Sequence, residues 1–212
     1  LAADATHEPI RRYAFRSFDR QWAFEDPRMA KTESPSLWWS ATDRQIFFAT
    51  SSYPLGLGPG LTVSTAVPDL HCFNGRGGKD IVPLYRDAKG TPNADPAILK
   101  ILSERFATRV TVERLFAYVF AVLAGADYTE RFNEELETPG PRVPITSDPT
   151  VFGRMVAHGE KLIWLQTFGE RFGSGDLPSA GIEWTAEPSR LPEGRADIKY
   201  DPATETLRIA DG

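Results

Sequence analysis

The sequence predicts an α+β fold: a mostly antiparallel sheet, a helical insertion of about four helices, and strands that return at the C-terminal end. Three observations predict it. Residues 1–93 are strand-rich, residues 94–172 carry apolar side chains at helical spacing, and the tail 181–212 returns to strand-like patterns. A chain of 212 residues can bury a sizeable core, and we expect a single domain over residues 1–212.

The predicted strands lie in the first part of the chain. Residues 45–52 and 61–67 are rich in β-branched and aromatic side chains with partial alternation. Glycine and proline punctuate residues 54–60, which predicts a loop between them. Residues 80–85 form a third expected strand, in which Pro83 favours an edge position or a bulge.

Helix starts are marked by capping residues. Asp95 precedes Pro96, Thr111 precedes an apolar run that stops at Gly125, residues 127–130 resemble a capping box, and residues 147–150 open a fourth helix. We expect the following side chains to face the core: Ile98, Leu99, Leu102, Phe106, Leu115, Phe116, Val119, Phe120, Leu123, Phe152, Met155, Val156, Leu162, Ile163 and Phe168. Residues 181–184 and 195–210 are then expected to form strands.

Composition limits the function classes. A net charge of −5 and a pI near 5.3 count against a nonspecific nucleic-acid binder, which should be basic. The one cysteine, Cys72, excludes an internal disulfide and a multi-cysteine zinc site, and fits a reducing cytoplasmic setting. No apolar run approaches the ~18 residues of a membrane span. The polar start without Met suggests a piece cut from a longer polypeptide.

Aromatic residues and arginines are concentrated in residues 13–28, where five aromatics and three arginines share sixteen positions. In an extended segment Phe18 and Trp22 could face the core while Arg16 and Arg20 point elsewhere. The guanidinium groups of these arginines could each donate two hydrogen bonds to the edge of a guanine, or bind a phosphate. The structural alternative is that Asp19 pairs with a neighbouring arginine and the aromatics pack.

Two further segments offer polar groups to DNA. Arg44 and Gln45 stand beside an expected strand, where arginine could bind guanine and glutamine could bind adenine. The alternative is that both side chains lie in solvent at the end of that strand. Residues 74–80 carry Asn74, Arg76 and Lys79 among glycines, which allow close approach to a phosphate. A surface hairpin is the alternative. Neither a Walker A loop nor a dinucleotide-binding fingerprint is present there.

A catalytic or metal role has little support. Asp69, His71 and Cys72 lie within four residues, but a metal site needs three or four ligands and only three histidines occur in the chain. We expect His71 to hydrogen-bond the backbone or DNA. Trp38 and Trp39 are adjacent, so one of them could be exposed for a partner domain.

The ordered set of these segments resembles the C-terminal specificity region of single-chain Type ISP restriction–modification enzymes over about residues 11–170. The family pattern has proline where this chain has Ser17. The matching positions are Phe15, Arg16, Phe18, Asp19, Arg20, Trp22, Asp26, Pro27, Arg44, Gln45, Asp69, His71, Pro83, Leu84, Tyr85, Tyr118, Ala121, Val122, Leu123, Tyr128, Arg131, Phe132, Pro141, Arg142, Val143 and Pro144.

The resemblance implies a bacterial, cytoplasmic target-recognition domain, truncated here, that binds double-stranded DNA beside methyltransferase and helicase-like domains of one parent chain. It implies a non-catalytic fragment without a cofactor or metal of its own, whereas the parent would use S-adenosylmethionine, ATP and Mg²⁺. Residues shared by the family should hold the fold or grip the DNA backbone, and base readers should lie in the loops 50–64 and 74–80. A structural or coupling domain is the alternative; an independent hydrolase using Asp69, His71 and Cys72 is a third, weakly supported one. The candidate DNA contacts are Arg16, Arg20, Arg44, Gln45, His71, Asn74, Arg76 and Lys79.

Overall fold

The computed structural model describes residues 10–24, 35–51, 59–69, 71–73, 79–135, 142–173, 197–201 and 206–210. The chain divides into two compact units, Leu1–Ser174 and Gly175–Gly212. The described part of the second unit is an antiparallel hairpin of β7 (Asp197–Asp201) and β8 (Thr206–Ala210), which confirms the predicted terminal strand pair. The strand expected at 181–184 lies outside the described residues, and a single domain over the whole chain stays a prediction.

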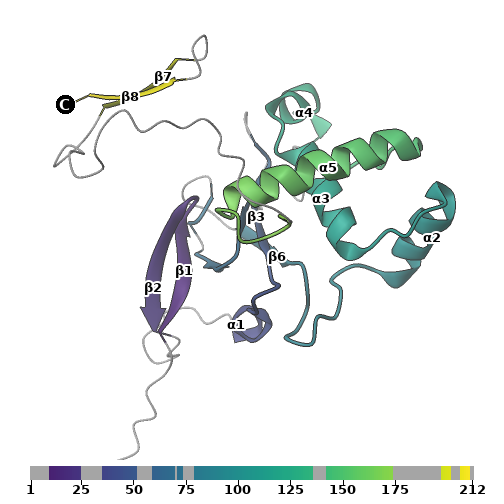
Figure 1. The fold of residues 1–212 in the computed structure, drawn as a ribbon, viewed down its shortest axis with the longest axis horizontal. Coiled ribbons are helices and arrows are strands. Elements are labelled where there is room, and N and C mark those ends of the chain that lie inside the picture. Colours follow the sequence, from purple (N-terminus) through teal and green to yellow (C-terminus); the bar gives the residue numbers. More distant parts are fainter. Residues whose placement is uncertain are drawn as a thin grey trace, which may run out of the picture. The chain divides into compact units, whose positions relative to one another are not determined.

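Two three-stranded sheets form the β part of the first unit (Figure 1). Their strands are β1 (Ile10–Arg16), β2 (Asp19–Phe24), β3 (Phe47–Ser51), β4 (Leu61–Ser64), β5 (Val67–Pro68) and β6 (Lys79–Pro83). One sheet, of order β4–β3–β6, is antiparallel. In the other, of order β2–β1–β5, β1 runs antiparallel to β2 and parallel to β5. Pro83 ends the edge strand β6, as predicted, because an edge position tolerates a missing N–H donor.

Five helices occupy the described part of the first unit: α1 (Pro35–Ser40), α2 (Pro96–Phe106), α3 (Val112–Leu123), α4 (Ala126–Arg131) and α5 (Pro149–Gln166). The expected N-caps are confirmed, since the side chains of Asp95, Thr111 and Asp148 each accept a hydrogen bond from the backbone of the first helical turn. The capping box at 127–130 is wrong, because α4 begins after Gly125 without a side-chain cap. Together with the sheets, these helices confirm the α+β prediction.

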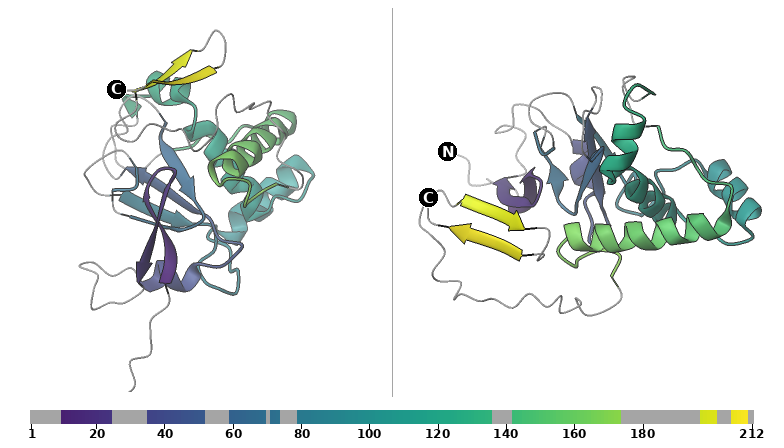
Figure 2. Two further views of the ribbon diagram at one scale, coloured as in Figure 1. Left: turned by 60° about the vertical axis from the view of Figure 1, so that its left-hand side comes forward. Right: turned by 90° about the horizontal axis from the view of Figure 1, so that it is seen from above.

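Helices α2 to α5 pack on one face of the β4–β3–β6 sheet (Figures 1 and 2). The ring of Phe48 on β3 lies 4.8 Å from that of Phe116 and 5.5 Å from that of Phe120, both on α3. Phe152 of α5 in turn stacks on Tyr118 of α3 at 4.9 Å between centroids. Aromatic contacts of this kind join α5, α3 and the sheet into one core.

The opposite face of that sheet meets the β1–β2 hairpin through small side chains. Ala14 of β1, Ala49 of β3, Ala66 and Cys72 are all buried and form a second cluster. Small residues let two sheets approach closely, so the hairpin is fixed against the central sheet by its first strand. The second strand and the turn between the two strands carry the more exposed side chains.

Four aromatic or aliphatic side chains expected in the core are exposed instead. Phe18 and Trp22 are each 63% exposed, Phe168 is 52% exposed and Ile98 is 46% exposed. Phe18 lies in the turn between β1 and β2, and Phe168 follows the end of α5; both adopt positive φ angles, so neither continues the preceding element. Trp22 lies on the face of the β1–β2 hairpin that also carries Arg12, and Ile98 lies near the start of α2; neither side chain enters the core.

No helix in the described stretches combines the length and the apolar character that crossing a membrane requires.

Candidate nucleic-acid interface

A cleft of about 300 Å³ opens between the β1–β2 hairpin, the end of α1 and the turn after α5. We call it the arginine cleft. Its charged lining consists of Arg11, Arg12, Arg20, Arg171, Asp43 and Glu170. Four guanidinium groups against two carboxylates leave positive charge at its surface, although the whole chain is acidic. A concave surface of this kind attracts anions.

Arg20 on β2 is held by the turn that follows α5. Its guanidinium pairs with Glu170 at 2.5 Å, donates to the Thr167 carbonyl at 3.3 Å and stacks 4.3 Å from the ring centroid of Phe168. Only 18% of its side chain is exposed. Arg20 therefore joins the hairpin to the helical layer, and little of its hydrogen-bonding capacity faces solvent.

Glu170 and Arg171 form the other half of this junction. Burial by itself would raise the pKa of Glu170, but hydrogen bonds from Arg20 and Thr65 and the nearby positive charges lower it. Burial lowers the pKa of Arg171, while the charges of Glu170 and Asp43 oppose that effect. Arg171 donates to the Gln45 carbonyl at 3.1 Å, so it too is tied to the fold.

Arg12 and Trp22 face each other across β1 and β2. The Arg12 guanidinium carbon lies 4.3 Å from the ring centroid of Trp22, and both side chains are exposed. Directly paired residues of an antiparallel ribbon project from the same face, which explains the contact. Arg12 thus presents a charged group from the rim of the arginine cleft while an aromatic ring supports it.

Arg16 lies at the end of β1, beside the segment 71–73. It donates to the His71 carbonyl at 2.7 Å and stacks 4.5 Å from the ring of Phe15. The next residue, Ser17, donates its N–H to the Cys72 carbonyl at 2.9 Å and its hydroxyl to the same oxygen at 3.1 Å. A proline at this position, as in the family pattern, could not make the N–H bond.

Tyr13, Asp69 and His71 anchor that segment to β1. Asp69 accepts from the Tyr13 hydroxyl and from the His71 backbone N–H, and it lies 3.1 Å from His71 Nδ1. Burial would raise the pKa of Asp69, but the hydrogen bonds from Tyr13 and His71 lower it. Tyr13, whose pKa is raised by burial and by Asp69, stacks on Trp38. These hydrogen bonds orient Asp69 and the segment 71–73 against β1.

His71 is half-exposed and Cys72 is buried. Across the described stretches, no three His, Cys, Asp or Glu side chains are grouped closely enough to hold a metal ion.

Arg44 and Gln45 lie at a different corner, near Tyr85. Gln45 is fully buried: Nε2 donates to the carbonyls of Ser40 and Tyr85 at 2.9 and 2.8 Å, and Oε1 accepts from the Tyr85 N–H at 3.0 Å. The Gln45 side-chain amide is occupied by hydrogen bonds to the backbone of Ser40 and Tyr85, so it cannot bind a base. The prediction that Arg44 and Gln45 form a base-reading pair is therefore corrected: only Arg44 is available. Arg44 is exposed and donates to the Tyr85 hydroxyl at 3.2 Å.

The remaining candidates belong to the glycine-rich segment. Lys79 is the first residue of β6 and pairs with Ser51, but its side chain is outside the described set. Asn74 and Arg76 lie outside the described residues, as do residues 52–58 of the loop expected at 50–64. The two ends of that expected loop belong to β3 and β4 instead.

Sequence reasoning missed Arg11, Arg12 and Arg171 as members of one surface. The consecutive arginines before Tyr13 were a usable signal, because alternation along a strand places Arg12 on the face that carries Trp22. Nothing in the sequence indicated that Arg171, more than a hundred residues further along the chain, would meet the hairpin.

Comparisons with known proteins place this geometry in a family. The family model for the Type ISP C-terminal specificity domain matches residues 2–212. No curated protein sequence matches the chain.

Three solved structures share the fold: a DrdV–DNA complex (24% identity, TM-score 0.64), a nuclease-deletion mutant of the Type ISP enzyme LlaGI with a DNA substrate mimic (16%, 0.57), and the ATP-dependent Type ISP enzyme LlaBIII bound to DNA (14%, 0.62). The aligned regions cover 75%, 79% and 79% of this chain, in the same order. They cover only 16%, 14% and 11% of the chains in those three structures, so this chain spans a small part of their length. On the match over residues 2–212, this chain belongs to the family of Type ISP C-terminal specificity domains.

Proposed function

We propose that this chain recognises a DNA sequence for a restriction–modification enzyme and positions the target for adenine-N6 methylation and cleavage by other domains of its parent chain. The single observation that carries the proposal is the exposed, arginine- and aromatic-rich β1–β2 hairpin, to which Arg16 belongs, in a member of a specificity-domain family. The three similar structures are DNA complexes, which supports duplex DNA as the ligand.

The chain covers a small share of those proteins, so the chemistry is assigned to the rest of the parent polypeptide. S-adenosylmethionine, ATP and Mg²⁺ would be bound there, and this fragment would bind none of them. The proposed contacts of this chain are Arg16, Arg44, His71, Asn74, Arg76 and Lys79. Arg20 and Gln45 leave the set because ion pairing and backbone hydrogen bonds occupy their polar atoms.

The test is selection from a pool of random duplexes at about 50 mM and about 200 mM salt, followed by sequencing, because backbone contacts weaken steeply with salt while base contacts preserve a motif. We expect one short motif to be enriched at both salt concentrations. Arg76→Ala or Arg44→Ala should relax that motif. Binding without any enriched motif would contradict sequence recognition by this chain.

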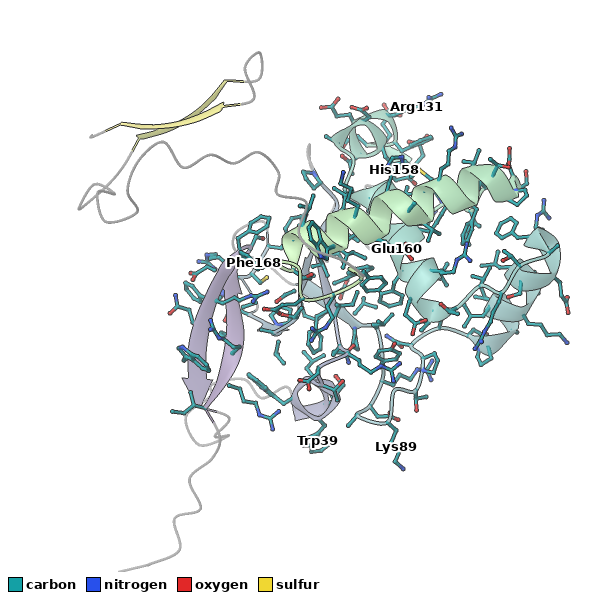
Figure 3. All side chains as sticks on the ribbon, viewed as in Figure 1. Trp39, Lys89, Arg131, His158, Glu160 and Phe168 are labelled. Atoms are coloured by element: carbon teal, nitrogen blue, oxygen red, sulfur yellow. The ribbon has the colours of Figure 1, made fainter. Side chains whose placement is uncertain are left out.

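A second function, coupling to methyltransferase or motor domains, is favoured by Trp39. Its side chain is 71% exposed and points away from α1 (Figure 3), whereas its neighbour Trp38 stacks on Tyr13. In the complete parent chain, Trp39→Ala would then reduce methylation or cleavage without changing the affinity for DNA. Unchanged activity would contradict this role.

A further inference from the structure

Three arginines around the β1–β2 hairpin stack on aromatic rings. Arg12 lies over Trp22 at 4.3 Å, Arg16 lies over Phe15 at 4.5 Å, and Arg20 lies over Phe168 at 4.3 Å. A guanidinium on a ring is confined to one plane and keeps the N–H groups of its outer edge available. The three arginines differ in how many of these N–H groups form hydrogen bonds or ion pairs within the protein.

Arg20 and Arg16 are engaged by the fold. Arg20 pairs with Glu170 and donates to the Thr167 carbonyl, and Arg16 donates to the His71 carbonyl. The Arg12 guanidinium contacts the ring of Trp22. Among the described residues, no carboxylate lies within ion-pair distance of Arg12. Of these three arginines, Arg12 therefore has the most donor groups that the described residues leave unused.

The charge of the hairpin favours an anionic ligand. Residues 10–24 hold four arginines and one aspartate, in a chain whose net charge is −5. The same segment exposes Ile10, Phe15, Phe18 and Trp22. Exposed aromatics between arginines give a surface that binds a phosphate backbone through charge and also contacts the sugars.

We propose that Arg12, held in place by Trp22, binds a phosphate of the DNA backbone and that the β1–β2 hairpin docks this domain on the duplex through that contact. The assignment rests on the proposed DNA recognition and adds a residue outside the contact set named above. A phosphate contact positions the protein without reading sequence, so Arg12 should govern affinity and salt dependence but not the preferred motif.

The experiment is a salt series of equilibrium binding to the duplex enriched in the selection, for the unaltered chain and for Arg12→Gln. Losing one phosphate contact should reduce the slope of log affinity against log salt by about 0.9 and weaken binding roughly five- to tenfold near 0.1 M salt. The motif selected from the random pool should be unchanged. Arg12→Lys should restore the slope, because it keeps the charge.

Two further variants separate the contact from general effects. Trp22→Leu keeps the charge but removes the ring, so affinity should fall while the slope stays near that of the unaltered chain. Arg105→Gln is the control: Arg105 is also exposed, but it lies in the last turn of α2, a helix away from the hairpin (Figure 1). This control should leave both slope and affinity unchanged.

The possible failures are distinguishable. If the unaltered chain binds its motif and Arg12→Gln retains the slope, the Arg12 assignment is wrong while DNA recognition stands; a protein partner would then be the better occupant of the hairpin. If Arg12→Gln changes the motif, Arg12 reads a base and the phosphate assignment is overturned. If the unaltered chain binds no duplex at low salt, both proposals fall. Circular dichroism of each variant excludes loss of folding as the cause.

Discussion

Arg20 and Glu170, 150 residues apart in the chain, form an ion pair that connects the β1–β2 hairpin to the turn after α5. Glu170 also accepts from the Thr65 hydroxyl at 2.8 Å, so one carboxylate joins three distant segments beside the arginine cleft. The orientation of the hairpin relative to the helical layer therefore depends on a contact that no local pattern encodes.

The first prediction concerns this ion pair. Glu170→Gln should lower the free energy of unfolding by about 0.5–1 kcal/mol, as expected for a partly exposed pair. Urea unfolding at neutral pH measures it. Glu104→Gln is the control, because Glu104 pairs with Lys100 at 3.9 Å with both side chains largely exposed. Equal effects of the two substitutions would show that the Arg20 pair contributes nothing specific.

The second prediction concerns acid. The hydrogen bonds from Tyr13 and His71 lower the pKa of Asp69 in the folded state. A carboxyl with a lowered pKa stabilises the fold above its unfolded pKa of about 3.9, and this stabilisation is lost as the pH falls through the folded value. Stability should therefore decline below about pH 4.

The check is urea unfolding of the unaltered chain and of Asp69→Asn across the acidic range and at neutral pH. The variant should be less stable at neutral pH and should lose less stability on acidification. Parallel curves for the two proteins would mean that Asp69 is not responsible for the acid sensitivity.

The third prediction tests Gln45 as a structural residue. Gln45→Leu would leave the Tyr85 N–H and two carbonyls without their buried partner, at a cost of roughly 3 kcal/mol or more. Thermal and urea unfolding would show the loss. Arg44→Gln, on the exposed neighbour, should change stability little. A stable Gln45→Leu variant with an altered DNA motif would return Gln45 to the set of base readers.

The fourth prediction concerns the contact of α3 with α5. A Cβ atom added at Gly159 would lie 1.8 Å from the Ala117 carbonyl oxygen, so Gly159→Ala should destabilise the protein by about 2–3 kcal/mol. Gly153 lies on the same helix with open space around it, and Gly153→Ala should stabilise by up to about 1 kcal/mol. Melting temperatures of the two variants should shift in opposite directions; shifts of the same sign would contradict the close packing.

Local chemistry made much of the fold predictable. Asp95, Thr111 and Asp148 cap helices as expected, because an N-cap bond involves only neighbouring residues. The short helix α1 was missed although Ser34 and Pro35 offer the same start signal as Asp95 and Pro96. The start of α4 was missed because Gly125 has no capping side chain. The family pattern grouped residues 15–22 with Asp69 and His71 in one domain, and the match over residues 2–212 confirms the family. The turn at Phe18 that folds residues 10–24 into a hairpin was not predicted.

The amino-acid sequence was enough to predict the α+β class, the starts of three helices, the family and the concentration of arginine beside aromatic residues. Which arginines are available depends on tertiary contacts. Gln45 is buried, Arg20 is paired with Glu170, and Arg12 stands exposed on Trp22. The physical reason is that propensity and capping act over a few residues, whereas burial and ion pairing depend on which distant segments the core brings together.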